Sequence, residues 1–444
     1  MGLFRQSPQG ETGRPREIFA WALYDWANSA YSTISITVLV SYVKRDVLPG
    51  KAGILLLGAG LGVTTFICAL ASPVLGAVAD AEAGKRRWLA ITALAGAAAS
   101  ACMFFATPDL RWLMIVLYVV ALAGMELSQT FYNAFLPEIA DDERIGRVSA
   151  WGYALGYVGG GLALALAIVM IAMGDRLHVP GDVVFRKRLG LLLMGLWWGG
   201  FSLPTVFILR DRSRPSGQAK RIGEAARLAF GSVGHTLKNI RSYRMLTLFM
   251  LGFLVYNDGV QTVISQASVF ADERLKMGPA ELGMVVLMIQ FIAFPGALAV
   301  GWLGDRVGQK PVLMACLAVW TVVVSFSFFI TEKWHFWCMS AVAALVLGGT
   351  QSVSRAIMAL MTPSEHTGEF FGFFNFSGKA TSVVGPVFFS VILAFTENPN
   401  LALASLLAFF VVGWAIVAPL NVDEGRRQAR RTDDDGDGQE ASGG

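Results

Sequence analysis

The sequence predicts an all-α membrane protein with twelve transmembrane helices in two pseudo-symmetric bundles of six. Its 444 residues are 55% hydrophobic and 15% charged, whereas soluble domains carry about 25% charged residues. The apolar residues form runs of roughly twenty, the length that crosses a bilayer. Two of these runs carry the same polar face. A large soluble core is the alternative, but it needs amphipathic helices with charged outer faces, and half of the runs carry no charge at all.

Each half of the chain contributes six apolar runs. The predicted N-terminal bundle, residues 1–210, contains Ile18–Val43, Ala52–Ala79, Trp88–Ala106, Arg111–Leu136, Val148–Met173 and Leu189–Leu209. The predicted C-terminal bundle, residues 245–420, contains Met245–Phe270, Ala280–Leu303, Pro311–Ile330, Phe336–Met361, Phe370–Phe395 and Leu401–Leu420.

Two polar segments lie outside the bundles. In the linker, residues 211–244, apolar residues recur at roughly helical spacing among Arg and Lys, which predicts either an amphipathic helix in the cytoplasmic interface or a loosely ordered linker. The tail, residues 421–444, is polar and is predicted to be disordered. Asp433, Asp435 and Asp437 match the start of a calcium loop, but its twelfth position is Gly444 instead of glutamate.

Basic residues predict the orientation of the chain. Twelve spans place both chain ends on one side of the membrane, and that side carries about twice as many Lys and Arg residues as the other. We therefore expect both termini in the cytoplasm, and a location in the cell or inner membrane if the protein is bacterial. The loop around Arg186, Lys187 and Arg188 opposes this rule.

Several other classes of protein are disfavoured. The four cysteines lie far apart inside apolar runs and predict neither disulfides nor a metal site. No phosphate loop is present, which excludes an ATP-driven pump, and an intramembrane enzyme would need a nucleophile and a base at depth. We expect no cofactor and no nucleic acid. The expected partners are the lipid bilayer, a small-molecule substrate and protons, and the expected state is a monomer.

A repeated polar ladder follows two aspartates, one in each half. The residues three, four, seven and ten positions later are polar in both runs: Asn28, Ser29, Ser32 and Ser35 after Asp25, and Gln261, Thr262, Ser265 and Ser268 after Asp258. This spacing keeps each ladder on one helix face. A carboxylate inside a span normally faces a water-filled cavity or a partner. The ladders therefore predict a duplicated membrane protein with a polar path between its halves.

A second repeat occurs in the loops after the second and eighth predicted helices. In both, a glycine precedes an aspartate by four positions and basic residues follow. Glycine lets helices approach closely, and aspartate can cap the N-terminus of a neighbouring helix. We predict a conformational latch made by Gly76, Asp80, Arg86, Gly301, Asp305 and Arg306.

These loops resemble the cytoplasmic motif of the major facilitator superfamily, Gly-x-x-x-Asp-Arg-x-Gly-Arg-Arg. The second copy matches well, whereas the first has Ala81 in place of arginine and one extra residue before Gly84. Five further segments are similar to signature segments of the vacuole effluxer-like branch: Tyr24–Tyr31, Tyr132–Glu138, Gly152–Tyr157, Tyr256–Gly259 and Phe370–Asn375. The resemblance implies a transporter whose first, fourth, seventh and tenth helices line a central cavity, with amino-acid efflux as the best-known activity.

Charges inside the spans indicate where solutes and ions would bind. Those lying well inside the spans are Asp25, Glu126, Asp258, Arg355 and Lys379, on the first, fourth, seventh, tenth and eleventh helices. The three acids are the candidate proton-coupling residues, because no histidine lies deep in a span. The alternative is permanent pairing with Arg355 or Lys379. This alternative is strongest for Asp25, whose expected depth is close to that of Arg355.

Arg355 and Lys379 are the candidate anion sites, because both side chains bind carboxylates. A substrate carboxylate would dock there while Asp25 or Asp258 receives an ammonium group. The alternative is charge neutralisation between helices, and for Tyr153 plain packing. The candidate substrate-binding residues are Asn28, Gln129, Asn133, Tyr153, Gln261, Gln351, Arg355, Asn375 and Lys379.

The leading hypothesis is a secondary active transporter of small polar solutes that works by alternating access, exports amino acids or related metabolites and is coupled to protons. The alternatives are a non-transporting membrane receptor on the same fold and a uniporter or drug-type exporter. A receptor would favour a large regulatory domain, and the sequence has only a short linker and tail.

Overall fold

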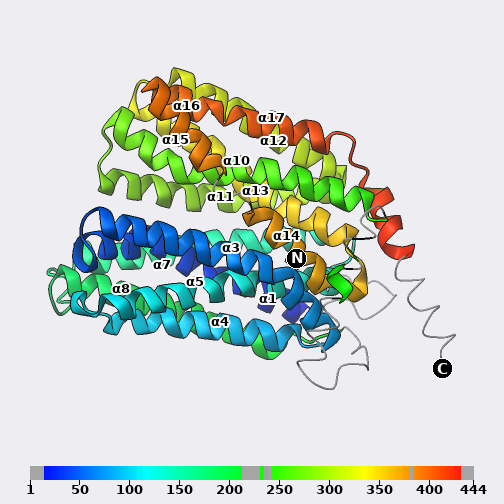
Figure 1. The fold of residues 1–444 in the computed structure, drawn as a ribbon, viewed down its shortest axis with the longest axis horizontal. Coiled ribbons are helices and arrows are strands. Elements are labelled where there is room, and N and C mark those ends of the chain that lie inside the picture. Colours follow the sequence, from blue (N-terminus) through cyan, green and yellow to red (C-terminus); the bar gives the residue numbers. More distant parts are fainter. Residues whose placement is uncertain are drawn as a thin grey trace.

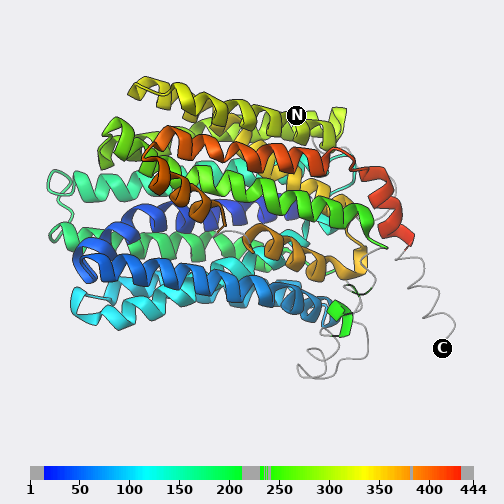
Figure 2. The same cartoon turned by 45° about the horizontal axis from the view of Figure 1, so that its top comes forward.

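Helices account for the regular structure of the chain. The computed structural model describes residues 15–212, 231–234, 236, 238, 242–380 and 384–431, and no strand occurs among them. Figures 1 and 2 show the N-terminal helices, coloured blue to cyan, packed beside the C-terminal helices, coloured green to red. These two groups correspond to the two predicted bundles.

The N-terminal bundle begins with an interrupted rod. Helix α1 (Pro15–Ile34) continues through the π-helical turn η1 (Ser35–Leu39), α2 (Val40–Tyr42) and the π-helical turn η2 (Val43–Val47). The other elements are α3 (Lys51–Ala81), α4 (Lys85–Cys102), η3 (Met103–Phe105), η4 (Pro108–Leu110), α5 (Arg111–Ala134), α6 (Leu136–Ile139), α7 (Ile145–Ala172) and α8 (Val183–Ile208).

The C-terminal bundle has longer helices at its start and divided ones at its end. Its elements are α10 (Arg244–Leu275), α11 (Pro279–Val307), α12 (Gln309–Phe326), η5 (Ser327–Phe329), α13 (Lys333–Met361), η6 (Ser364–His366), α14 (Thr367–Lys379), α15 (Val384–Thr396), α16 (Pro399–Ser405) and α17 (Leu407–Val417).

Among the residues that the structure describes, eleven helical segments are long and apolar enough to cross a membrane. They correspond to the second to twelfth predicted helices. The first predicted helix is not among them because the polar face of α1 lowers its hydropathy. With this rod, the chain has the predicted twelve helices, and the all-α membrane fold is confirmed.

Three expectations from the sequence need correction. Helix α8 begins at Val183, so the basic residues 186–188 lie in a helix and not in a loop. The eleventh predicted helix is divided, since α14 ends at Lys379 and α15 begins at Val384. Residues 422–431 are helical, so this part of the tail is not disordered. Most of the predicted linker helix and residues 432–444 lie outside the described residues.

The two bundles share one packing pattern. In the N-terminal bundle α1 packs against α8, α4 against α5 and α8, and α3 against α5. In the C-terminal bundle α10 packs against α17, α12 against α13 and α17, and α11 against α13. Between the bundles, α3 packs against α14 and α7 against α11. Equivalent helices therefore make equivalent contacts, which is the arrangement expected of duplicated halves.

Candidate functional site

A cavity of about 600 Å³ lies between the two bundles, a volume typical of small-molecule sites. Helices α3 and α5 bound it on one side, and α10, α14 and α15 bound it on the other. Its α3 residues come from the first half of that helix, so the cavity lies toward the side opposite the chain ends. The polar and charged side chains in its wall are Thr65, Glu126, Gln261, Lys379 and Ser390.

An ion pair between the bundles faces this cavity. Lys379 Nζ on α14 lies 3.1 Å from Glu126 Oε1 on α5. Glu126 is buried, whereas Lys379 is half-buried and lines the cavity together with it. The pair neutralises both charges, yet the ammonium group is still accessible to a solute.

A second ion pair between the bundles is completely enclosed. Arg355 Nη1 on α13 lies 3.1 Å from Asp25 Oδ2 on α1, and Arg355 is 1% exposed. The same nitrogen donates to Asn133 Oδ1 at 3.1 Å, and the rest of the guanidinium donates to the hydroxyl and carbonyl of Ser149 at 3.0 and 2.7 Å. Tyr132 donates to Asp25 at 2.8 Å. Asp25 and Arg355 are therefore paired in this conformation.

Aromatic rings cover the remaining surface of Arg355. Its guanidinium carbon lies 4.2 Å from the ring centre of Tyr153, 4.6 Å from that of Trp21 and 5.5 Å from that of Tyr132. Such contacts stabilise a buried cation. Of the predicted substrate-binding residues, Arg355, Asn133 and Tyr153 thus engage one another, and none of them lines the cavity.

Two other predicted substrate-binding residues also bridge the bundles. Asn375 Nδ2 donates to Ser72 Oγ at 3.0 Å and to Thr130 Oγ1 at 3.2 Å. Gln351 Oε1 accepts from the Tyr157 hydroxyl at 2.8 Å. These amides hold the bundles together in the present conformation, and their contacts break when the bundles separate.

The remaining predicted residues have looser surroundings. Asp258 accepts a hydrogen bond from the Gly385 N–H at 3.0 Å through Oδ2, while its buried Oδ1 has no partner among the described residues. Asn28 Nδ2 is likewise buried without a partner there. Gln261 is half-buried in the cavity wall, and Gln129 is half-buried on α5 but outside that wall.

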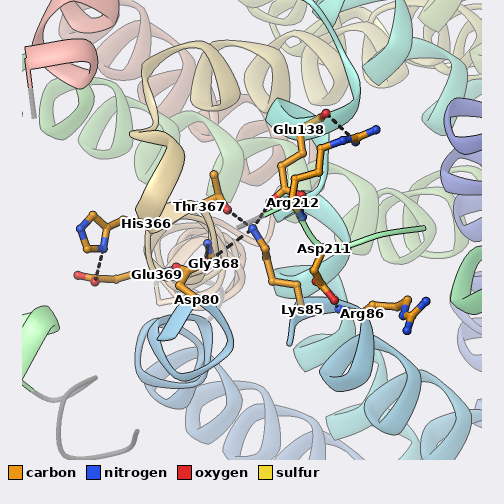
Figure 3. Close-up of polar contacts among 10 residues, drawn as sticks. All are labelled: Asp80, Lys85, Arg86, Glu138, Asp211, Arg212, His366, Thr367, Gly368 and Glu369. Carbon is orange, nitrogen blue, oxygen red and sulfur yellow. Dashed lines mark hydrogen bonds and ion pairs between the residues drawn. The ribbon is translucent and has the colours of Figure 1, made fainter. Parts of the chain in front are cut away.

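The first latch joins the end of α3 to the start of α14, and Figure 3 shows its side chains. Asp80, at the end of α3, accepts the backbone N–H groups of Gly368 and Glu369, each at 2.9 Å, and so caps α14 of the other bundle. Gly76 lies one turn earlier, and a Cβ atom there would come within 2.0 Å of the Gly368 oxygen. Only glycine permits this close approach of α3 and α14.

Lys85 completes the first latch from α4. It is completely buried, and its ammonium contacts the Glu138 carboxylate, donates to Thr367 Oγ1 at 2.7 Å and lies 3.8 Å from Asp80 Oδ1. Figure 3 shows it between these three groups. Lys85 therefore contacts both bundles: the carboxylates of Glu138 and Asp80 belong to the N-terminal bundle, and the Thr367 hydroxyl belongs to the C-terminal bundle.

The second latch repeats this arrangement with the bundles exchanged. Asp305, near the end of α11, accepts the N–H groups of Gly146 and Arg147 at 2.9 and 3.1 Å and so caps α7. The Arg147 side chain adds a 2.8 Å ion pair. A Cβ atom at Gly301 would lie 2.3 Å from that of Ala150. The capping that the sequence predicts is thus present in both halves.

Two predicted latch residues need correction. Arg86 does not approach Asp80; its backbone N–H donates to Asp211 at 3.0 Å and its side chain to the Leu209 oxygen at 3.4 Å. Burial raises the pKa of the Asp211 carboxyl. Arg306 is exposed and lies 3.9 Å from the ring centre of Trp302. Consecutive helical residues point about 100° apart, so the neighbour of each latch position faces elsewhere.

The linker contacts the first latch at two places. Arg212 donates to the Glu138 backbone oxygen at 2.8 Å. Farther along, Ser232 and Thr236 both donate to the Glu369 carboxylate, the latter at 2.6 Å. Glu369 belongs to the helix start that Asp80 caps, so linker and latch meet on the same turn of α14.

The sequence did not single out several of these groups. No motif or unusual spacing marks the residues around Arg355, which are Tyr132, Ser149 and Trp21. The same holds for two latch residues, Arg147 and Thr367. Tyr132 adjoins the predicted residue Asn133 within one signature segment, which is the one signal that could have drawn attention to it.

Known proteins share this sequence pattern. Residues 51–430 match the family model described as vacuole effluxer Atg22 like. The uncharacterized MFS-type transporter YxiO of Bacillus subtilis is 31% identical over 405 residues, covering 90% of this chain and 93% of that protein. Autophagy-related protein 22 of Kluyveromyces lactis is 23% identical over 375 residues, covering 78% of this chain and 75% of that protein.

Solved structures share the fold. The Escherichia coli fucose:proton symporter FucP superposes with a TM-score of 0.67 at 14% identity, covering 92% of this chain and 98% of that one. The proton:xylose symporter XylE gives a TM-score of 0.67 at 12% identity, covering 90% and 94%. Identities this low show the fold alone. The architecture is that of a multi-pass transporter of the major facilitator type.

Proposed function

Because the chain belongs to the vacuole effluxer Atg22-like family of membrane transporters, which are not enzymes, we propose that it moves small zwitterionic solutes, amino acids or related metabolites, by alternating access. Efflux is the proposed direction, with both termini in the cytoplasm. The observation that supports the substrate class is the ion pair of Glu126 and Lys379 in the cavity wall.

A zwitterion matches this pair chemically. Its carboxylate can bind the Lys379 ammonium, and its own ammonium can bind Glu126, so one ion pair is exchanged for two without leaving a buried charge unpaired. The acid that receives the ammonium is therefore Glu126 in this proposal, in place of Asp25 or Asp258. Asp25 is engaged with Arg355 and lies outside the cavity wall.

Both latches close the side that carries the chain ends, whereas the cavity lies toward the opposite side. With the termini in the cytoplasm, this conformation holds the site toward the exterior, from which an exported solute is released. Rocking of the bundles breaks the latch caps on one side and closes the cavity on the other, so the site is exposed alternately.

Proton coupling is proposed to act through Glu126. A proton on this carboxylate removes its attraction for Lys379 and frees the ammonium for a substrate carboxylate. Asp25 is a poor candidate, because it is engaged with Arg355 and Tyr132 and lies outside the cavity wall.

Transport by purified protein in proteoliposomes, measured against a panel of amino acids with and without an imposed pH gradient, tests this proposal. We expect saturable transport of a zwitterion that falls at least tenfold in Lys379→Ala, and coupling to the pH gradient that is lost in Glu126→Gln. The matched control is Lys333→Ala, which removes another lysine–glutamate pair, between α13 and α11, outside the cavity wall.

The alternatives give different results in the same assay. A non-transporting receptor would bind solute without moving it across the vesicle membrane. A drug-type exporter would move apolar cations and ignore zwitterions, and a uniporter would transport equally well without a pH gradient. Full activity of Lys379→Ala would contradict the assigned substrate site.

A further inference from the structure

Asp258 differs from the other two acids of the interior because no cation accompanies it. Its side chain is buried, with 2% of the residue exposed. Lys379 and Arg355 each lie 3.1 Å from one of the other acids, but among the described residues no lysine, arginine or histidine nitrogen lies within ion-pair distance of Asp258. One of its oxygens, Oδ1, has no hydrogen bond either. A buried carboxylate with neither neutralising charge nor full hydrogen bonding is costly.

Thr262, one turn farther along α10, has a second unused oxygen. Threonine hydroxyls in this protein regularly donate to the backbone oxygen four residues earlier, as Thr92, Thr350 and Thr362 do at 2.7 to 2.8 Å. The Thr262 hydroxyl makes no such bond and has no partner among the described residues, although the residue is completely buried. Its oxygen is turned away from its own helix and left available.

Both oxygens converge on one place beside α15. A Cβ atom at Gly385 would lie 1.9 Å from Thr262 Oγ1 and 3.3 Å from Asp258 Oδ1. These distances place both oxygens against the Gly385 backbone, and the two oxygens do not hydrogen-bond to each other. A buried carboxylate oxygen and a buried hydroxyl oxygen that face the same backbone, with no donor directed at either among the described residues, suit a small cation.

The divided helix supplies a favourable field at this place. Helix α14 ends at Lys379, and the Gly378 backbone oxygen near that end accepts a hydrogen bond from Asn257, the neighbour of Asp258, at 3.1 Å. The negative end of the α14 dipole therefore lies beside the aspartate. The C-terminal ends of broken helices are where transporters commonly bind Na⁺.

We propose that Asp258 Oδ1 and Thr262 Oγ1 are ligands of a bound Na⁺ ion next to the solute cavity. One carboxylate neutralises one charge, so the site takes a monovalent cation. A proton on Asp258 would also remove the charge, and its O–H could donate to Thr262 Oγ1, so the responses to Na⁺ and to acidification are measured separately. Gln261 and Pro386, the neighbours of Thr262 and Gly385, line the cavity and place the ion site next to it.

Thermal unfolding of the purified full-length chain in detergent tests this site without any solute. At constant ionic strength, replacement of choline chloride by NaCl is expected to raise Tm saturably, because an ion that binds only the folded state stabilises it. Potassium is expected to have no such effect. Thr262→Val keeps the shape and the carboxylate but removes one ligand, so it should raise the half-saturating Na⁺ concentration by about tenfold or more. Asp258→Asn should abolish the shift.

The matched control is Ser268→Ala, on an exposed part of the same polar ladder, which should leave the Na⁺ response unchanged. Equal shifts with choline and NaCl, or a normal response in Thr262→Val, would overturn the site. So would stabilisation that depends on acidification and not on Na⁺, which would make Asp258 a protonation site. A role of this Na⁺ site in transport rests on the proposed function, but the site itself does not. Na⁺ binding without solute movement would refute the proposed function and leave the site supported.

Discussion

Arg355 carries a positive charge in the interior between the two bundles. An acid, two polar groups and three aromatic rings surround it. The sequence predicted which five charges lie inside the spans and that Asp25 and Arg355 have similar depth. It offered pairing of the acids with Arg355 or Lys379 as an alternative but did not specify that Glu126 pairs with Lys379, because that choice depends on the register between helices of different bundles. Nor did it predict that Asp258 has no cationic partner in the described part of the chain.

We predict that Arg355→Ala lowers the free energy of unfolding by about 3 to 5 kcal/mol, because it leaves Asp25 buried without its partner. Chemical unfolding in detergent measures this loss. The exposed Lys333 provides the control, and Lys333→Ala should cost less than about 1 kcal/mol.

The double variant Asp25→Asn with Arg355→Ala should be less destabilised than the sum of the single variants, because the unpaired charge is gone. A stable Arg355→Ala protein that has lost only solute binding would show instead that this arginine is a substrate ligand.

Two aspartates, each near the cytoplasmic end that we propose for its helix, connect helices of opposite bundles. The sequence predicted these caps from the glycine–aspartate spacing, and the structure assigns them to α14 and α7. The predicted cations were wrong in both latches: Lys85 takes the place of Arg86 in the first, and Arg147 on α7 takes the place of Arg306 in the second. The sequence repeat does not specify which way a basic side chain points. The division between α14 and α15 was also missed, because residues 370–395 read as one apolar run.

We predict that Asp80→Ala or Asp305→Ala shifts the protein toward a state open on the side of the chain ends. Loss of a cap costs about 1 to 2 kcal/mol, which changes the population about 5- to 30-fold. Labelling of Ser72→Cys by a thiol reagent, in a protein without its four native cysteines, reports the opening because Ser72 is buried between α3 and α14.

Asp182→Ala is the matched control for this experiment. Asp182 caps α8 through the Phe185 N–H at 2.8 Å, but that cap lies within one bundle. Its loss should leave the labelling rate of Ser72→Cys unchanged. Equal rates in the Asp80, Asp305 and Asp182 variants would show that the latches do not control the opening.

At the scale of the whole molecule, the duplication and the two bundles were readable from the sequence, and each basic residue of the local exception to the charge rule has a partner. Lys187 pairs with Asp46 at 2.6 Å and Arg186 with Asp175 at 2.5 Å. The side-chain hydrogen bond with Arg186 holds the pKa of Asp175 below its usual range. Arg188 donates to the Phe104 oxygen at 2.6 Å. These contacts show how each basic side chain is held, but the rule counts Lys and Arg whether or not acids pair with them, so the local exception stands.

The distance between the bundles, measured on both sides of the protein, tests alternating access most directly. In the first pair, one spin label is attached in the α3–α4 connection and one in the α13–α14 connection. In the second pair, the labels are attached in the η2–α3 and α10–α11 connections on the opposite side. When a transported amino acid is added, alternating access predicts that one distance grows while the other shrinks. The Lys379→Ala variant should show neither change. Two distances that stay constant during transport, or that change in the same direction, would contradict alternating access.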